Sequence, residues 1–260
     1  MKLPADPAKR SALLAAGGLV IGLALVLAVF GPRKSEWRGM GLTRILQEED
    51  KWRQDLWLQG SHINEQELWQ IQETLAVRVQ ISTAGLKGLV RRAVNAKDAA
   101  YQANGHLLAG NTAVAAALAG KIAAARSTEK GGESEAARWL RRRADALWRG
   151  NLEDASPALN EALALAGDKD SAQRRELLKD LASWHWHRAL FRPEDPAAEL
   201  RRGSQAVESL LAFEPALPRE DRVAGWRLRG RLLLRLACLN LQRDAGALEQ
   251  AALSFQQALE

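Results

Sequence analysis

Histidines are the side chains in this chain best suited to catalysis or metal binding, and two of the four lie close together. These two occur in the segment Trp184-His185-Trp186-His187. The surrounding sequence predicts a helix, on which residues two apart point about 200° apart, so His185 and His187 are not expected to hold one metal ion. We expect instead a helix with one aromatic face buried and the histidines at its edges.

No sequence motif adds a reactive centre to these histidines. The chain lacks the phosphate-binding, dinucleotide-binding, zinc-protease and nucleophile-elbow patterns. Acidic residues such as Glu153 and Asp154 fall at predicted turns and in first turns of helices, where the helix dipole favours negative charge. Cys238 is the one cysteine; it lies in the apolar run LLLRLACLNL and is expected in the core. The sequence thus predicts no catalytic, cofactor-binding or metal-binding residue, and a protein that is not an enzyme.

Arginine is the distinctive charged residue, and three arginines share one predicted helix face. Arg227, Arg231 and Arg235 are spaced four residues apart, whereas Arg229 lies off this row. Like charges at this spacing destabilise an isolated helix. Either acidic side chains of a neighbouring helix or an acidic ligand must therefore offset them.

A shorter basic row consists of Arg138 and Arg142, with Asp145 next on the same predicted face. We predict that both rows bind a protein partner through acidic segments, because arginine recognises carboxylates with a planar pair of donors. A solvated face with internal salt bridges is the simpler alternative. Nucleic acid is not an expected partner, because the formal net charge is only +6 and no motif combines aromatic and basic residues.

An uncharged stretch near the start of the chain predicts attachment to a membrane. The residues between Arg10 and Arg33, positions 11–32, carry no charge. As a helix, a stretch of this length crosses a hydrocarbon layer of about 30 Å. A signal peptide cut after Ala28 is the alternative, but the apolar run continues to Phe30 and favours an uncleaved, single-span anchor in contact with the bilayer.

The flanks of this stretch carry similar numbers of basic residues, so they determine its orientation poorly. A short basic start before a first apolar segment usually stays in the cytoplasm. We therefore expect a bacterial inner-membrane protein with a periplasmic body, with a cytoplasmic body as the alternative. Gly18 and Gly22 have the spacing at which two membrane helices approach closely. A homo-oligomer held together through this contact is therefore an alternative to a monomer.

Hydrophobic periodicity predicts helices of about 12 to 24 residues throughout the remaining chain, and no stretch alternates like a strand. The predicted class is all-α. We divide the chain into a membrane anchor (1–32), a membrane-proximal helical hairpin (33–83), Ala-rich helices (84–126), a linker rich in turn-forming residues (127–134) and helical repeats (135–260).

Two places in the last segment carry a repeated pattern. After Gly150 come a small Ala155, a bulky Leu159 and the pair Ala162-Leu163. The small residue lets two helices approach, and the later ones face the next pair of helices. A second copy of the pattern consists of Ala251, Phe255, Ala258 and Leu259.

These residues resemble the tetratricopeptide repeat, although Arg142 and Arg143 stand where that family usually has leucine and a small residue. The resemblance implies antiparallel helical hairpins that stack as a solenoid after the N-terminal transmembrane helix. It also implies that peptides bind in a concave groove. A helical bundle without repeats is the alternative.

These expectations predict a membrane-anchored adaptor or scaffold that mediates protein–protein interactions in a bacterial envelope complex. The alternative is the anchor and regulatory part of a longer enzyme or effector, whose catalytic domain lies beyond residue 260 or in a partner. We also expect the apolar face of the helix that ends near Glu260 to be covered, either by further sequence or by a partner, because solenoids need a polar cap.

Overall fold

The computed structural model describes residues 83–150, 155–166, 171–191, 194–213, 217–239 and 245–260, together with Ile45 and Gln47. Every regular element in this part of the chain is a helix, which confirms the all-α class for these residues. The helices are α4 (Thr83–Val94), α5 (Ala99–Leu108), α6 (Thr112–Ser127), α7 (Glu133–Gly150), α8 (Ser156–Ala166), α9 (Ser171–Phe191), α10 (Pro196–Leu211), α11 (Arg219–Leu239) and α12 (Ala245–Gln257).

The predicted membrane span at 11–32, with Gly18 and Gly22, lies outside the described residues. The same holds for nearly all of the predicted hairpin at 33–83. Among the helices that the structure does describe, none combines the length and the apolar character needed to cross a bilayer.

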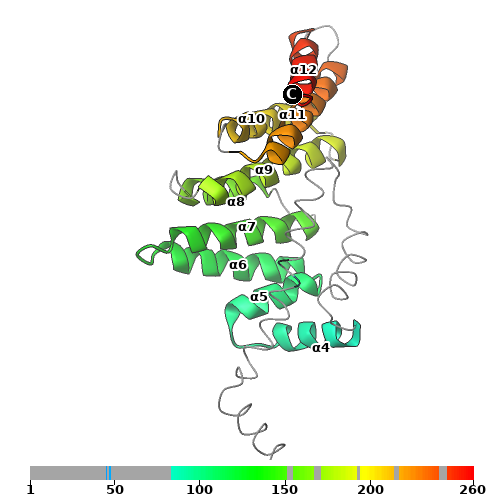
Figure 1. Ribbon diagram of the computed structural model, residues 1–260. Helices are drawn as coiled ribbons and strands as arrows, with labels where there is room; N and C mark the ends of the chain where they lie inside the picture. Colours follow the sequence, from blue (N-terminus) through cyan, green and yellow to red (C-terminus); the bar gives the residue numbers. More distant parts are fainter. Residues whose placement is uncertain are drawn as a thin grey trace, which may run out of the picture.

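The described helices form one row, from α4 at one end to α12 at the other (Figure 1). Each helix packs chiefly on the helix before it and the helix after it. Chains built in this way have the arrangement of helical repeats, in which contacts are local and the body grows in one direction.

Side-chain caps and glycines explain where several helices begin and end. The Asp98 carboxylate accepts a hydrogen bond from the Tyr101 N–H at 2.6 Å at the start of α5. Asp195 does the same at α10, where Pro196 follows in the first turn. Gly110 has a φ of 78°, a left-handed conformation that favours glycine, in the turn between α5 and α6.

The segment predicted as a linker, 127–134, contains the turn that connects α6 to α7. Gly131, with a φ of 78°, lies in this turn. The two helices pack closely side by side, through buried alanines that include Ala119, Ala123, Ala136 and Ala137. Because alanine has a short side chain, helix axes lined with it come close together.

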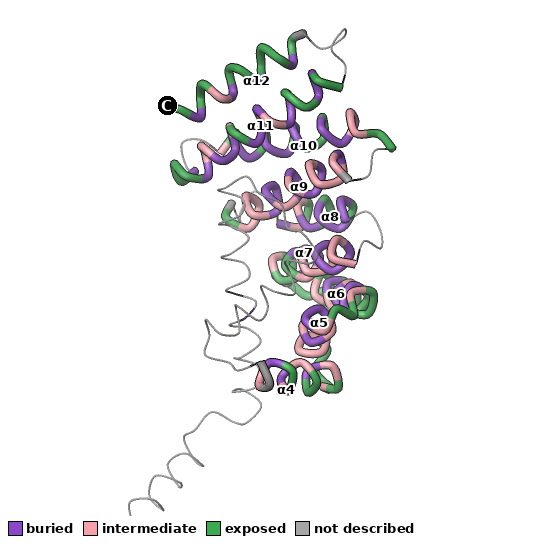
Figure 2. The backbone as a smooth tube through the Cα atoms, turned by 90° about the vertical axis from the view of Figure 1, so that its right-hand side faces the viewer, coloured by how far each residue is buried: buried purple, intermediate pink, exposed green. Residues whose placement is uncertain are grey.

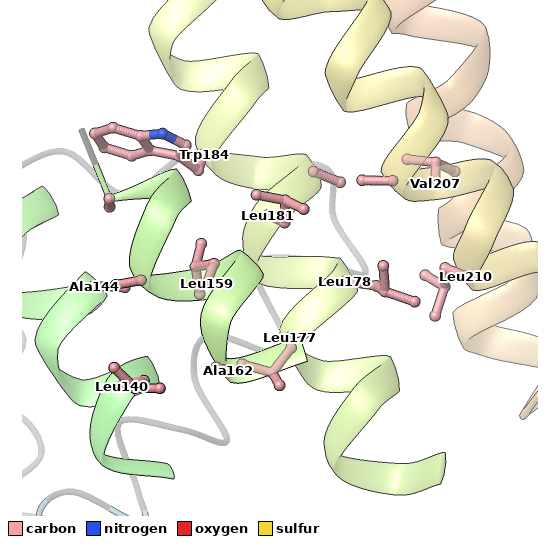
Figure 3. Packing of buried hydrophobic residues seen from close by; sticks show 14 of the residues in the cluster. Leu140, Ala144, Leu159, Ala162, Leu177, Leu178, Leu181, Trp184, Val207 and Leu210 are labelled. Carbon is pink, nitrogen blue, oxygen red and sulfur yellow. The ribbon is translucent and has the colours of Figure 1, made fainter. Parts of the chain in front are cut away.

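A continuous apolar core extends from α5 to α11. Figure 3 shows its middle part, where Leu159 and Ala162 of α8 lie between Leu140 of α7 and Leu177 of α9. Of the residues that carried the repeat pattern here, Ala155, Leu159 and Ala162 are core residues, each at most 2% exposed, and Leu163 packs against this core partly buried. Cys238 is different: its predicted place in the core is wrong, because it lies on the exposed side of α11.

Candidate partner-binding surface

Charged pairs join alternate helices of the row. Between α7 and α9, Arg141 contacts Asp180. Between α9 and α11, the Lys179 ammonium lies 2.8 Å from Asp221, and both side chains are almost fully buried. Glu176 supplies a second carboxylate to Lys179 at 2.9 Å. In both links the cation belongs to the earlier helix and the acid to the later one.

A second buried cluster joins α9 to α10. The His185 Nδ1 atom lies 2.6 Å from the Glu199 carboxylate, and both side chains are buried. Arg202 donates to the other oxygen of Glu199 at 3.2 Å, and Arg188 approaches it to 3.7 Å. The prediction that the histidines lie at helix edges is wrong for His185, because α9 is covered by α8 on one side and by α10 on another.

The other half of this histidine segment faces different neighbours. Trp184 and His187 both pack against Trp148 of α7, with ring centroids 5.3 and 5.6 Å from that ring. The two imidazoles thus contact different helices. Among the described residues, no group of three or more histidines, cysteines or acids is placed to hold a metal ion. These charges and rings connect helices.

The shorter of the two predicted basic rows is partly used inside the protein. Arg142 lies 3.5 Å from Asp145, the acid that the sequence placed next on this face. The same carboxylate accepts two hydrogen bonds from Arg149, at 2.9 and 3.0 Å. Burial lowers the pKa of Arg149 to about 9, so its guanidinium is still protonated at neutral pH. Arg138 is exposed.

Arg229 of α11 also serves the internal structure, which agrees with its place off the predicted row. It donates to Glu208 of α10 at 2.8 and 3.1 Å and to the Ser254 hydroxyl of α12 at 2.8 Å. Its guanidinium stacks over Trp226 at 5.7 Å. One side chain thus holds three consecutive helices together.

The three arginines of the longer row lie on the outer side of α11. Arg227 and Arg235 are exposed, and Arg231 is half-buried. Within the described residues, neither Arg227 nor Arg235 forms a salt bridge. We call these three residues the arginine face of α11. Arg227 and Arg235 of this face present positive charge to the solvent, where an acidic group of another molecule can reach them.

Exposed apolar side chains gather at the same end of the row as the arginine face. Apart from Val114 of α6, the large apolar residues that are exposed in the described part of the chain all belong to α11, to α12 or to the turn that follows α12. They are Leu234, Leu239, Leu248, Leu253 and Leu259. Figure 2 shows this end of the row, with long exposed stretches along α12. Apolar surface that is grouped in this way typically marks a place where another molecule binds.

Comparisons with known proteins place the chain in no family. No family model, no curated protein and no solved structure matches it. The likeness to tetratricopeptide repeats therefore remains a prediction based on the residues given above.

Sequence reasoning did not find the buried charges Lys179, Glu199 and Asp221. Each lies on a helix with charged residues on several sides, which is the usual appearance of a solvated helix. The one available signal was the length of the predicted helices around α9 and α11, because long helices in the middle of a row are covered on more than one side.

Proposed function

We propose that this protein is a membrane-anchored adaptor whose row of helices binds protein partners. The one-dimensional stacking of α4 to α12 supports this proposal, because such a row exposes more surface than a compact bundle of the same length. Residues 11–32 supply the anchor in this proposal. They hold the body at a bacterial inner membrane, on its periplasmic side.

The observation that carries the proposal is the arginine face of α11. Elsewhere in the row, Arg141, Arg149 and Arg229 are engaged by acids within the chain. Arg227 and Arg235 are exposed and lie beside apolar surface. A partner that offers carboxylates gains charge-assisted hydrogen bonds there, and it buries the neighbouring leucines at the same time.

Tethering adds to this binding in a simple way. A body fixed to the membrane meets partners in the same membrane at a raised effective concentration, so modest contacts are enough to hold a complex together. In this proposal the helices act as a tetratricopeptide-like scaffold. The hairpins are α7 with α8, α9 with α10, and α11 with α12.

Membrane attachment is tested by fractionating cells that express the full chain and a form without residues 1–32. We expect the full chain to resist alkaline extraction from membranes and the shortened form to be released. Protease added to spheroplasts then reports the side, and digestion of the body is the result expected for a periplasmic location. A shortened form that stays in the membrane would contradict the anchor.

Partner binding is tested by chemical cross-linking in intact membranes, followed by purification of the tagged full chain. Replacing both Arg227 and Arg231 by glutamate should remove the cross-linked partners, because it replaces attraction of carboxylates with repulsion. Replacing both by lysine keeps the charge and serves as the matched control. Equal yields of cross-linked partners from the glutamate variant and the unchanged chain would contradict this role of the arginine face.

A further inference from the structure

The hairpin of α11 and α12 has a face that is both apolar and basic. Phe255 of α12 packs directly over Gly230 of α11, where a Cβ atom would lie 2.7 Å from its ring. On one flank of this contact, Arg229 donates to Ser254 and to Glu208 of α10. The hydrogen bond between Arg229 and Ser254 therefore marks the flank that faces α10.

The exposed residues lie on the opposite flank. At about 100° per residue, Arg227, Leu234 and Cys238 lie well over a third of a turn from Arg229 around α11. Around α12, Leu248 lies about a third of a turn from Ser254, and Ala252 lies farther round in the same direction. The two helices run antiparallel (Figure 1). Helical spacing therefore puts these positions on the same side of the hairpin. We call this set the hairpin face; its members are Arg227, Arg231, Leu234, Cys238, Leu248 and Ala252. Arg235 lies at its edge, one turn beyond Arg231.

No described helix covers the hairpin face. Leu248 is 53% exposed and Leu234 is 39% exposed, and among the described helices α12 packs chiefly on α11. In the turn after α12, Leu259 extends the apolar surface and is 85% exposed. Earlier hairpins of the row differ, since their corresponding sides are covered by the next helix along the chain. The apolar residues Val207 and Leu210 of α10, for instance, are fully buried.

Charge indicates what kind of helix fits on this face. A cation of α7 meets an acid of α9, and a cation of α9 meets an acid of α11. On α11 itself, Arg227 and Arg235 have no acidic partner among the described residues. A helix that continued this arrangement would bring carboxylates to these arginines and an apolar stripe to Leu248, Ala252 and Leu234.

We propose that the hairpin face is a docking site for an amphipathic helix of a protein partner, with acidic residues along one edge of its leucine-rich stripe. The inference rests on the proposed adaptor function and specifies the chemistry of one partner. The docked helix packs side by side with α11 and α12, buries Leu234 and Leu248, and pairs its carboxylates with Arg227 and Arg235.

The test uses the full chain in lipid nanodiscs and two synthetic helical peptides of about 20 residues. Both peptides have leucine or alanine at every third or fourth position. In one peptide glutamate flanks this stripe, and in the other lysine takes the place of each glutamate. Fluorescence anisotropy measures binding, and the rate at which a maleimide alkylates Cys238, the one cysteine of the chain, reports whether the hairpin face is covered.

We expect the glutamate peptide to bind at least about tenfold more tightly than the lysine peptide and to slow the alkylation of Cys238. Leu248→Glu should weaken binding of the glutamate peptide by about tenfold. Leu253→Glu is the matched control: this leucine is 59% exposed on the same helix but lies off the hairpin face. Its replacement should leave binding unchanged. Replacing both Arg227 and Arg235 by glutamate should reverse the preference between the two peptides.

Three results would overturn the docking site. They are equal binding of the two peptides, equal losses from Leu248→Glu and Leu253→Glu, and alkylation of Cys238 at an unchanged rate under saturating peptide. If partners are still cross-linked in membranes but neither peptide binds the chain, the adaptor function is supported and the proposed docking site is wrong. Sedimentation gives a further outcome. If it shows a dimer that the Leu248→Glu substitution dissociates, and neither peptide dissociates that dimer, the occupant of the hairpin face is a second copy of the chain.

Discussion

At the scale of single residues, Lys179 is the charge on which the contact between α9 and α11 depends most. Its side chain is 5% exposed, and its ammonium lies within 3 Å of both Asp221 and Glu176. A buried cation is tolerated only where carboxylates balance it. The pair therefore fixes which residues of two non-consecutive helices meet.

Replacing Asp221 by asparagine should lower the free energy of unfolding by about 2–3 kcal/mol, because Lys179 stays buried with half of its compensation removed. Urea denaturation followed by circular dichroism measures the change. Glu220→Gln is the matched control, because Glu220 is the exposed neighbour, and its replacement should cost less than about 0.5 kcal/mol. Equal effects of the two variants would show that the buried pair does not hold α11 on α9.

At the scale of helices, small residues set the distances between axes. Gly105 of α5 lies against α4 so closely that a Cβ atom would be 2.5 Å from Cβ of Ala93 and 2.8 Å from the Val94 nitrogen. Such atoms cannot move aside without a shift of the α4 backbone. Gly88, on α4 itself, has open space around it.

Gly105→Ala should therefore destabilise the protein by about 1–3 kcal/mol, although alanine is the better helix former. Gly88→Ala should instead stabilise it by up to about 1 kcal/mol. Thermal unfolding of the two variants shows the opposite signs directly. A rise in Tm for both would mean that α4 and α5 are not in close contact.

Ala155, just before α8, is fully buried against the core. Leucine at this position should overpack the contact between α7 and α8 and cost about 1–3 kcal/mol. Ala164→Leu, at an exposed position of α8, is the control and should change stability by less than about 0.5 kcal/mol. An unchanged denaturation midpoint for Ala155→Leu would contradict the close packing that the repeat pattern predicted.

The helices themselves could be read from the sequence because their signals are local. Asp98 and Gly110 mark helix ends through their own side chain or backbone freedom. The exposed Cys238 and the buried His185 could not be predicted, because both depend on which face of a helix its neighbours cover. Periodicity places a residue on a face, but tertiary packing decides which faces are covered.

At the scale of the whole molecule, the row of helices gives the protein many local contacts and an extended surface. The arginines of α11 were singled out from their spacing alone, and the structure places them beside exposed leucines. The sequence could not show this, because much of the apolar part of the surface comes from α12 and from the way that α12 packs on α11.

The most direct test of the adaptor proposal is site-specific photo-cross-linking in living cells. A photoreactive amino acid replaces Leu234 beside the arginine face, or Val114 on α6, which is similarly exposed. We predict a discrete protein adduct at position 234 that is absent at position 114 and is lost when Arg227 and Arg231 are glutamates. No adduct at position 234, or the same adducts at both positions, would contradict the account.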